Sequence, residues 1–285
     1  YLCLANKNDD VSSYKPYIRR VQSILSKYDN TNQHCSYEFI HDFLDVIHEE
    51  TKSDVCLRPH VLPRQSYVRD LSRYVDDAGL LRQYQQANIK NHILFEYYRY
   101  CKTIKQSNVT KYISAITCQL VQCTECKYIS PTFNLLSIID VSIGNIHDRD
   151  LVSLLKNELN NEMIEDYFCD KCNKTVPCLI NIRLFYTNKY IIFALKRFNM
   201  SFRKLSMPIS CPETLDVSSI SWYFSNNNKQ YALTGIVEHQ GSYAGGHYIA
   251  KCKQNDTWYY YNDDHASIDS AFDAQNAYIL FYTMC

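Results

Sequence analysis

The sequence predicts an α+β fold, with helices in the first hundred residues and strands in most of the remainder. Apolar residues recur at helical spacing in the first fifty residues. From Ile93 onward the apolar segments are rich in Ile, Tyr, Val and Thr, which favour strands. Two C-x-x-C pairs in this second part add a candidate metal site. With 285 residues, the chain can hold one large domain or two small ones.

The N-terminal helices are predicted from two apolar stripes. The first runs through residues 17–28 (YIRRVQSILSKY), and the second runs through residues 37–50 (YEFIHDFLDVIHEE). Residues 52–92 are polar and contain Pro59 and Pro63, which interrupt helices. We expect an irregular insertion there, with one helix near residues 78–90.

Strands are predicted from runs of β-branched and aromatic residues, and one amphipathic helix is expected among them at residues 148–163. The last run, AYILFYTM, is almost continuously apolar, as expected of a strand that is buried on both faces. The expected strands lie within residues 92–104, 111–123, 134–143, 179–186, 189–198, 231–239, 247–253, 257–262 and 277–284.

The bulk composition disfavours several classes of protein. Lys and Arg number 30, as do Asp and Glu, and this zero formal charge disfavours a nucleic-acid binder such as a zinc-ribbon module, because phosphate binding needs a basic face. No window carries the roughly 18 apolar residues of a membrane span, and no signal-peptide pattern opens the chain. Thirteen cysteines, an odd number, fit a reducing compartment better than a disulfide framework. We expect an intracellular protein, cytoplasmic or nuclear, that binds neither nucleic acid nor membrane.

Two cysteine pairs form the strongest local signal. Cys123 and Cys126 lie in CTEC, and Cys169 and Cys172 lie in CDKC. Together they supply the four thiolates of a tetrahedral zinc site, which we expect at the tips of long β-ribbons. The alternatives are chance pairing among many cysteines and a redox role. Four thiolates leave no open position for catalysis, so the zinc is expected to be structural.

A histidine and an asparagine near the C-terminus form a candidate catalytic pair. His247 follows Gly245 and Gly246 and begins a strand, and Asn262 and Asp263 follow the next strand. A short turn between antiparallel strands would place His247 beside Asn262. An imidazole acts as a base when a partner accepts from its other ring nitrogen, so the pair has the chemistry of a base and its orienter in a hydrolase. The alternatives are a core histidine with satisfied hydrogen bonds and an ordinary Asn-Asp-Asp turn.

These motifs resemble, in order and over nearly the whole chain, those of the ubiquitin-specific proteases, a family of deubiquitinating cysteine peptidases. The family's histidine box is matched by YALTGIVEHQGSYAGGHY, and the segments that follow it are matched by WYYYND and AYILFY. Upstream, LKRF and the two cysteine pairs also agree. The family's helix box is matched at Glu38, Phe39, Leu44, Asp45, His48, Glu49 and Glu50.

The resemblance implies a papain-like right hand, with a helical thumb (residues 1–100), fingers that carry the zinc (101–185) and a β palm (186–285). His247 would be the general base, Asn262 its orienter, and Asp263 a support for the oxyanion or an ordered water. The loop of residues 240–246 would be a mobile lid over the tail of ubiquitin. Residues implied to contact ubiquitin are Glu38, Phe39, Phe198, His239, Gly245, Gly246 and Tyr248. From the residues alone, Glu38 and Phe39 can equally be the start of an amphipathic helix capped by Cys35 or Ser36.

The chain departs from the family pattern in two places. Cys35 stands where the family usually has Asp, and the cysteine box that normally precedes the helix box is absent. Cys3 precedes a polar segment, not the buried helix that activates such a thiol. We therefore expect the nucleophile to be encoded upstream of Tyr1.

Two hypotheses follow from the resemblance. The first is an enzyme that cleaves after the C-terminal glycine of ubiquitin in ubiquitinated proteins. The alternative is a ubiquitin-binding pseudoprotease that works as a scaffold. The retained His247 and Asn262 favour the enzyme, because a site that had long lost its activity has no reason to keep both.

Overall fold

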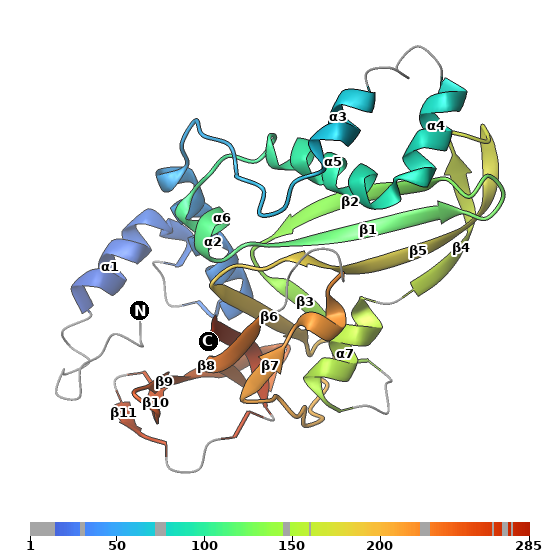
Figure 1. The fold of residues 1–285 in the computed structure, drawn as a ribbon. Coiled ribbons are helices and arrows are strands. Elements are labelled where there is room, and N and C mark those ends of the chain that lie inside the picture. The colour runs from blue at the N-terminus through green and yellow to red at the C-terminus, as the bar shows by residue number, and fades with distance from the viewer. Residues whose placement is uncertain are drawn as a thin grey trace.

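The computed structural model describes residues 15–28, 32–71, 78–144, 149–159, 161–222, 229–263, 265–269, 273–274 and 276–285 (Figure 1). Cys3 lies outside the described residues. The helices are α1 (Lys15–Ile24), η3 (Ser26–Tyr28), α2 (Ser36–Thr51), α3 (Gln65–Leu71), α4 (Ala78–Ala87), α5 (Ile89–Cys101), α6 (Asn108–Tyr112), α7 (Leu151–Glu158) and η4 (Ser218–Ile220). The strands are β1 (Ala115–Cys123), β2 (Ile129–Leu136), β3 (Ile139–Ser142), β4 (Asn161–Cys169), β5 (Lys174–Tyr186), β6 (Tyr190–Lys196), β7 (Thr214–Asp216), β8 (Gln230–Ser242), β9 (Gly245–Gln254), β10 (Thr257–Asn262), β11 (His265–Ile268) and β12 (Ala277–Met284).

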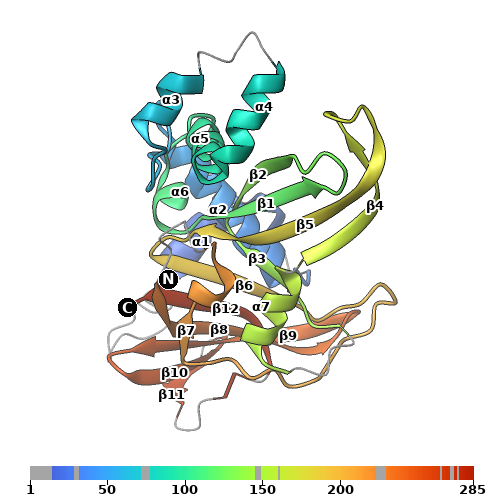
Figure 2. The same cartoon turned by 45° about the vertical axis from the view of Figure 1, so that its right-hand side comes forward.

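The smaller of two sheets has four antiparallel strands in the order β2-β1-β5-β4. Helices α3, α4 and α5 lie over β1 and β2 in both views, and the end formed by β4 and β5 projects away from the larger sheet (Figure 2). Residues Ile93, Leu94 and Tyr97 of α5 pack into one buried cluster with Phe133 and Phe185 of the sheet. This apolar contact fixes the base of the smaller sheet against the helices.

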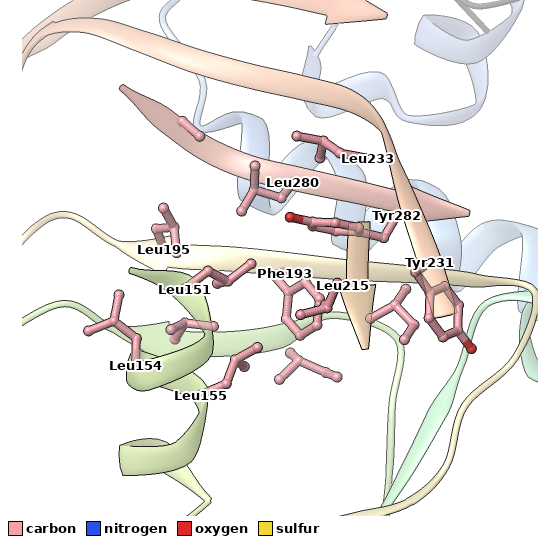
Figure 3. Packing of buried hydrophobic residues seen from close by; sticks show 14 of the residues in the cluster. Leu151, Leu154, Leu155, Phe193, Leu195, Leu215, Tyr231, Leu233, Leu280 and Tyr282 are labelled. Carbon is pink, nitrogen blue, oxygen red and sulfur yellow. The ribbon is translucent and has the colours of Figure 1, made fainter. Parts of the chain in front are cut away.

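The larger sheet has the order β11-β10-β9-β8-β12-β6-β3, with β7 paired to β8. Among the strands of this sheet in the described residues, β3 and β6 pair in parallel and the other pairs are antiparallel. Successive residues of β6 alternate between two buried clusters: Ile192 packs in the cluster that contains Leu44 of α2, and Phe193 packs in the one that contains α7. Figure 3 shows the second cluster, in which Leu151, Leu154 and Leu155 of α7 lie beside Phe193 and Leu280. Both faces are covered, which explains the continuous apolar runs of β6 and β12.

Helices in the N-terminal part and sheets in the remainder confirm the predicted α+β class. None of the helices in the described ranges is long and apolar enough to span a bilayer. The division of the chain into thumb, fingers and palm stays a prediction.

The structure differs from the sequence-based expectation at several elements. Besides the two described next, α3 is a second helix in residues 52–92, where one was expected, and β7 and β11 were not expected. Residues 92–104 were expected as a strand from their aromatic and β-branched content, but most of them form α5. The buried positions Ile93, Tyr97 and Cys101 recur every four residues, which is a helical spacing that outweighed composition.

The helix expected over residues 148–163 begins at Leu151 and ends at Glu158, and residue 161 already starts β4. Asp150 caps this helix by accepting a hydrogen bond from the Ser153 N–H. The strand β4 was not predicted because it is an exposed edge with several acidic residues, and its pairing with β5 determines its conformation.

Candidate active site

His247 and Asn262 lie together at one end of the larger sheet. The Nε2 of His247 is 2.5 Å from the Oδ1 of Asn262. An amide oxygen only accepts, so Nε2 carries the proton and Nδ1 of the neutral ring keeps its lone pair. Within the described part of the chain, no group hydrogen-bonds to Nδ1. The imidazole is therefore arranged to take a proton at Nδ1.

A tight turn places these two side chains on one face. Asn255 and Asp256, between β9 and β10, have φ values of 47° and 62°, which is the left-handed pair of a type I′ hairpin turn. The turn fixes a register in which Tyr261 is opposite Ala250. His247 and Asn262 are consequently diagonal neighbours on adjacent strands, a separation that side chains of this length can bridge.

Asp263 stands beside this pair without a direct hydrogen bond to it. Its Oδ2 is 3.9 Å from the Nε2 of His247, and 81% of its side chain is exposed. Its backbone is in the left-handed region, with φ of 49°, so the chain turns away after Asn262. Asp263 contributes an exposed negative charge, whereas Asn262 makes the orienting contact.

His247 lines a cleft of about 630 Å³ between the segment that leads into α2 and the hairpin of β8 and β9. Most residues that the resemblance assigned to ubiquitin contact line this same cleft. They are Glu38, Phe198, His239, Gly245, Gly246 and Tyr248.

Phe39 is not among the residues that line the cleft. Its ring packs edge-on against Tyr28 at a centroid distance of 5.0 Å and stacks with Phe43 at 6.1 Å. The structure therefore places Phe39 in the packing between the N-terminal helices, one residue beyond the cleft-lining Glu38.

The segment of residues 240–246, expected to be a lid loop, is the paired tip of a hairpin. Gln240 is opposite His247, and Ser242 is opposite Gly245, which leaves Tyr243 and Ala244 as the turn. The backbone pairing extends further than expected because small residues allow the two strands to approach closely.

Two glycines are required by this close approach. A Cβ on Gly246 would lie 2.2 Å from the Nε2 of His239, and Gly241 has a φ of 119°. The N–H of Gly246 donates to the Oε1 of Gln33 over 3.1 Å, which ties the hairpin tip to the segment before α2.

An aromatic wall closes one side of the cleft. The ring of His239 lies 5.6 Å from Phe198, 4.7 Å from Tyr248 and 6.3 Å from Tyr278 between centroids. Burial lowers the pKa of His239, and the nearby Lys204 ammonium lowers it further. Burial also raises the pKa of Tyr278. The wall is therefore uncharged at neutral pH.

Outside the hairpin tip, four further residues line the cleft that were given no site role from the sequence: Gln33, His34, Cys35 and Tyr278. The Sγ of Cys35 is 3.4 Å from the Oη of Tyr278. Tyr278 lies in the matched segment AYILFY, so its place in that motif could have indicated a role at the site. Gln33 and Cys35 come close to the hairpin only through the tertiary fold.

The four cysteines of the predicted metal site also come together. They lie at the hairpin ends of β1–β2 and β4–β5, and their sulfur atoms are all within 4.8 Å of one another. Cys123 and Cys172 are 3.7 Å apart and Cys126 and Cys169 are 3.8 Å apart, measured between sulfurs. A tetrahedron with zinc–sulfur bonds of about 2.3 Å has edges of about 3.8 Å, so the donor set fits zinc.

The two cysteine hairpins share one backbone geometry. Lys127 follows the first pair with φ of 58°, and Asn173 follows the second with φ of 53°. In each hairpin the N–H of this residue donates to the carbonyl of the first cysteine, over 3.1 Å and 2.8 Å respectively. Burial opposes ionisation of the Cys123 thiol, but N–H groups such as that of Cys126 lower its pKa to about 7.

A second and larger cavity, of about 780 Å³, lies between α2, the smaller sheet and α7. Its lining includes the acidic side chains Asp45, Asp140 and Glu158. The cavity is lined by Tyr37, His41 and His48 of α2, whereas Glu38 of the same helix lines the cleft, so α2 separates the two.

Comparisons with known proteins agree with this geometry. A family model described as ubiquitin carboxyl-terminal hydrolase matches residues 4–282. Ubiquitin carboxyl-terminal hydrolase 4 of Eremothecium gossypii is 28% identical over 279 residues, which cover 89% of this chain and 31% of that protein. Usp2 of Drosophila melanogaster is 27% identical over 268 residues, which cover 90% of this chain and 26% of that protein. The chain thus spans about a third or less of the length of these two relatives.

Two solved structures share the fold. A structure of the SAGA DUB module with Ubp8, Sgf11, Sus1 and Sgf73 covers 100% of this chain and 56% of its own, at 24% identity and a TM-score of 0.65. A SAGA DUB module bound to monoubiquitin covers 88% of this chain and 64% of its own, at 20% identity and a TM-score of 0.57. These likenesses confirm the expected papain-like right hand with β fingers.

Proposed function

This chain belongs to the ubiquitin carboxyl-terminal hydrolase family, and from that membership we propose that it is the greater part of the catalytic domain of a thiol-dependent deubiquitinase. The observation that carries the proposal is the hydrogen bond of 2.5 Å between His247 and Asn262, which leaves Nδ1 as a proton acceptor beside the cleft. The reaction is cleavage of the peptide or isopeptide bond after the C-terminal glycine of ubiquitin.

The proposed chemistry uses His247 twice. A cysteine outside the described residues gives its thiol proton to Nδ1, and the thiolate attacks the glycine carbonyl. The imidazolium then protonates the departing lysine amine, which leaves a thioester on the enzyme. Water, deprotonated by the same imidazole, hydrolyses the thioester and restores the thiol. Asn262 holds the ring throughout by accepting from Nε2, and Asp263 orients an ordered water that in turn donates to the oxyanion.

The cleft is proposed to hold the tail of ubiquitin. Its aromatic wall of Phe198, His239 and Tyr248 is uncharged, and Gly245 and Gly246 border it where the hairpin packs closely against Gln33 and His239. Glu38 is the acidic side chain of α2 that borders this channel. Phe39 acts indirectly, because its packing holds the start of α2 in place.

The body of ubiquitin is proposed to be gripped by the zinc-carrying fingers, residues 101–185. Zinc would be held by Cys123, Cys126, Cys169 and Cys172, and it would supply rigidity to the two hairpins that border the smaller sheet. Since four thiolates close the coordination shell, the metal has no place in the reaction. The partners are ubiquitin and ubiquitinated proteins, and the proposed location is inside the cell, where thiol ligands stay reduced.

A ubiquitin probe with a C-terminal electrophile tests this function on the full-length protein. We expect labelling at a single cysteine outside the described residues, with His247→Ala losing the label while ubiquitin binding persists. Cys35→Ala is the matched control, because Cys35 lines the same cleft, and it should label normally. Labelling at Cys35 would contradict the assignment of the nucleophile. Binding of ubiquitin without any labelling would contradict the enzyme hypothesis and support the pseudoprotease scaffold.

A further inference from the structure

The orienting residue of this site is an amide, and an amide has two unlike ends. With the oxygen of Asn262 toward His247, Nε2 carries the proton and Nδ1 is the base. Turned by half a rotation about its last bond, the amide would present N–H to Nε2 and force the proton onto Nδ1. That tautomer cannot receive the proton of a thiol at Nδ1. A carboxylate in the same place would not have this ambiguity, because both of its ends accept.

One side chain contacts the other end of this amide. The Nδ2 of Asn262 donates to the Oη of Tyr260 over 3.2 Å. The two residues are two positions apart on β10, so their side chains share one face of the sheet. The backbone of β10 is paired on both sides, with Tyr260 opposite Lys251 of β9 and opposite Ser267 of β11. The backbone of Tyr260 is therefore held in place by two neighbouring strands, which fixes the position from which its hydroxyl accepts.

We infer that Tyr260 is a positioning residue, which keeps the amide of Asn262 in the orientation that makes Nδ1 of His247 the base. This inference rests on the proposed function, because it assigns the residue a part in the same proton transfer. A tyrosine hydroxyl can donate as well as accept, so the contact alone does not fix which end of the amide faces Tyr260. The charged state of His247 during catalysis does fix it. When the ring becomes an imidazolium, its Nε2–H must face an acceptor. Of the two ends of the Asn262 amide only the oxygen provides one, and the Oδ2 of Asp263, 3.9 Å away, is beyond hydrogen-bond distance. In that state the N–H end of the amide needs the acceptor that Tyr260 supplies.

The experiment combines kinetics with imidazole ¹⁵N spectra of the full-length protein. His247 is assigned through His247→Ala, and its tautomer is read from which ring nitrogen carries the proton. In Tyr260→Phe we expect kcat to fall about threefold to tenfold with KM unchanged, as for the loss of one neutral hydrogen bond. We also expect His247 to populate both tautomers. Tyr259→Phe is the control of matched size on the opposite face of the strand, and it should change neither quantity.

Repeating Tyr260→Phe in an Asn262→Asp protein separates the effect of amide orientation from the effect of general packing. In Asn262→Asp the carboxylate accepts from either end, so adding Tyr260→Phe should leave the tautomer at Nε2–H and cost less than about twofold in kcat. An unchanged tautomer in Tyr260→Phe, or an equal loss of kcat in both backgrounds, would overturn the inference. If the wild-type protein fails to cleave ubiquitin substrates, the proposed function fails, but the tautomer measurement still tests the contact.

Discussion

Protonation of the buried His92 is expected to lower the stability of the folded protein in mild acid. Its side chain is 3% exposed on α5, and neither ring nitrogen has a hydrogen-bond partner among the described residues. Burial lowers the pKa of His92 from 6.5 to about 4, with a smaller contribution from the charge of Lys171. The unfolded chain therefore binds a proton near pH 6.5, which the folded chain does not accept until about pH 4. The contribution of neutral His92 to the free energy of unfolding is fully present above pH 6.5. It is lost as the pH falls toward 4, and the loss is about 2 kcal/mol at pH 5.

Urea denaturation of wild type and His92→Phe at pH 7.5 and pH 5 measures this effect. At pH 7.5 the variant should be as stable as wild type or slightly more stable, because two unsatisfied polar atoms are removed. At pH 5 its advantage should grow by about 2 kcal/mol, while the exposed control His265→Phe should follow wild type. Acid release of zinc would affect all three proteins alike and cancels in the comparison. An identical pH dependence of wild type and His92→Phe would refute the reasoning.

Three further outcomes can be checked independently. Cys169→Ser should abolish stoichiometric zinc and lower the melting temperature, whereas zinc content equal to wild type by metal analysis would disprove the four-thiolate site. Gly246→Ala must displace the ring of His239, so we expect kcat/KM on a ubiquitin substrate to fall about tenfold or more; an unchanged value would show that the hairpin tip adapts freely. In the wild type, Lys251 lies 3.0 Å from the buried carboxylate of Glu238. Lys251→Met removes this cation, and urea denaturation should show that the free energy of unfolding falls by about 3 to 5 kcal/mol. A loss below about 1 kcal/mol would count against the buried pair.

The hairpin of β9 and β10 shows how far sequence reasoning reaches. Alternating apolar residues, a two-residue Asn-Asp turn and the spacing of His247 and Asn262 are all local features, so pairing and site could be anticipated together. The cysteine hairpins are predictable for the same reason, because thiolate chemistry restricts the possible ligand sets.

Features that depend on tertiary contacts were not predictable in this way. Composition suggested a strand where α5 forms, because the buried face of a helix can carry the same residues as a strand. Gln33 bonds to Gly246 across a separation of 213 residues, and no local pattern encodes such a contact. Tyr260 lies in an aromatic strand with no motif of its own, and the role proposed for it rests on its contact with Asn262 in the folded protein.

The position of β12 has a consequence for biosynthesis. This strand, residues 277–284, lies between β6 and β8, so it joins the two halves of the larger sheet. Before β12 emerges from the ribosome, the half with β8 to β11 has no partner on one edge, and the half with β3 and β6 has none on the other. The helix α2 packs on β6 and β12, whereas His247 sits on β9, so β12 lies between the elements that form the two walls of the cleft. The activity proposed above therefore requires the complete larger sheet, including β12.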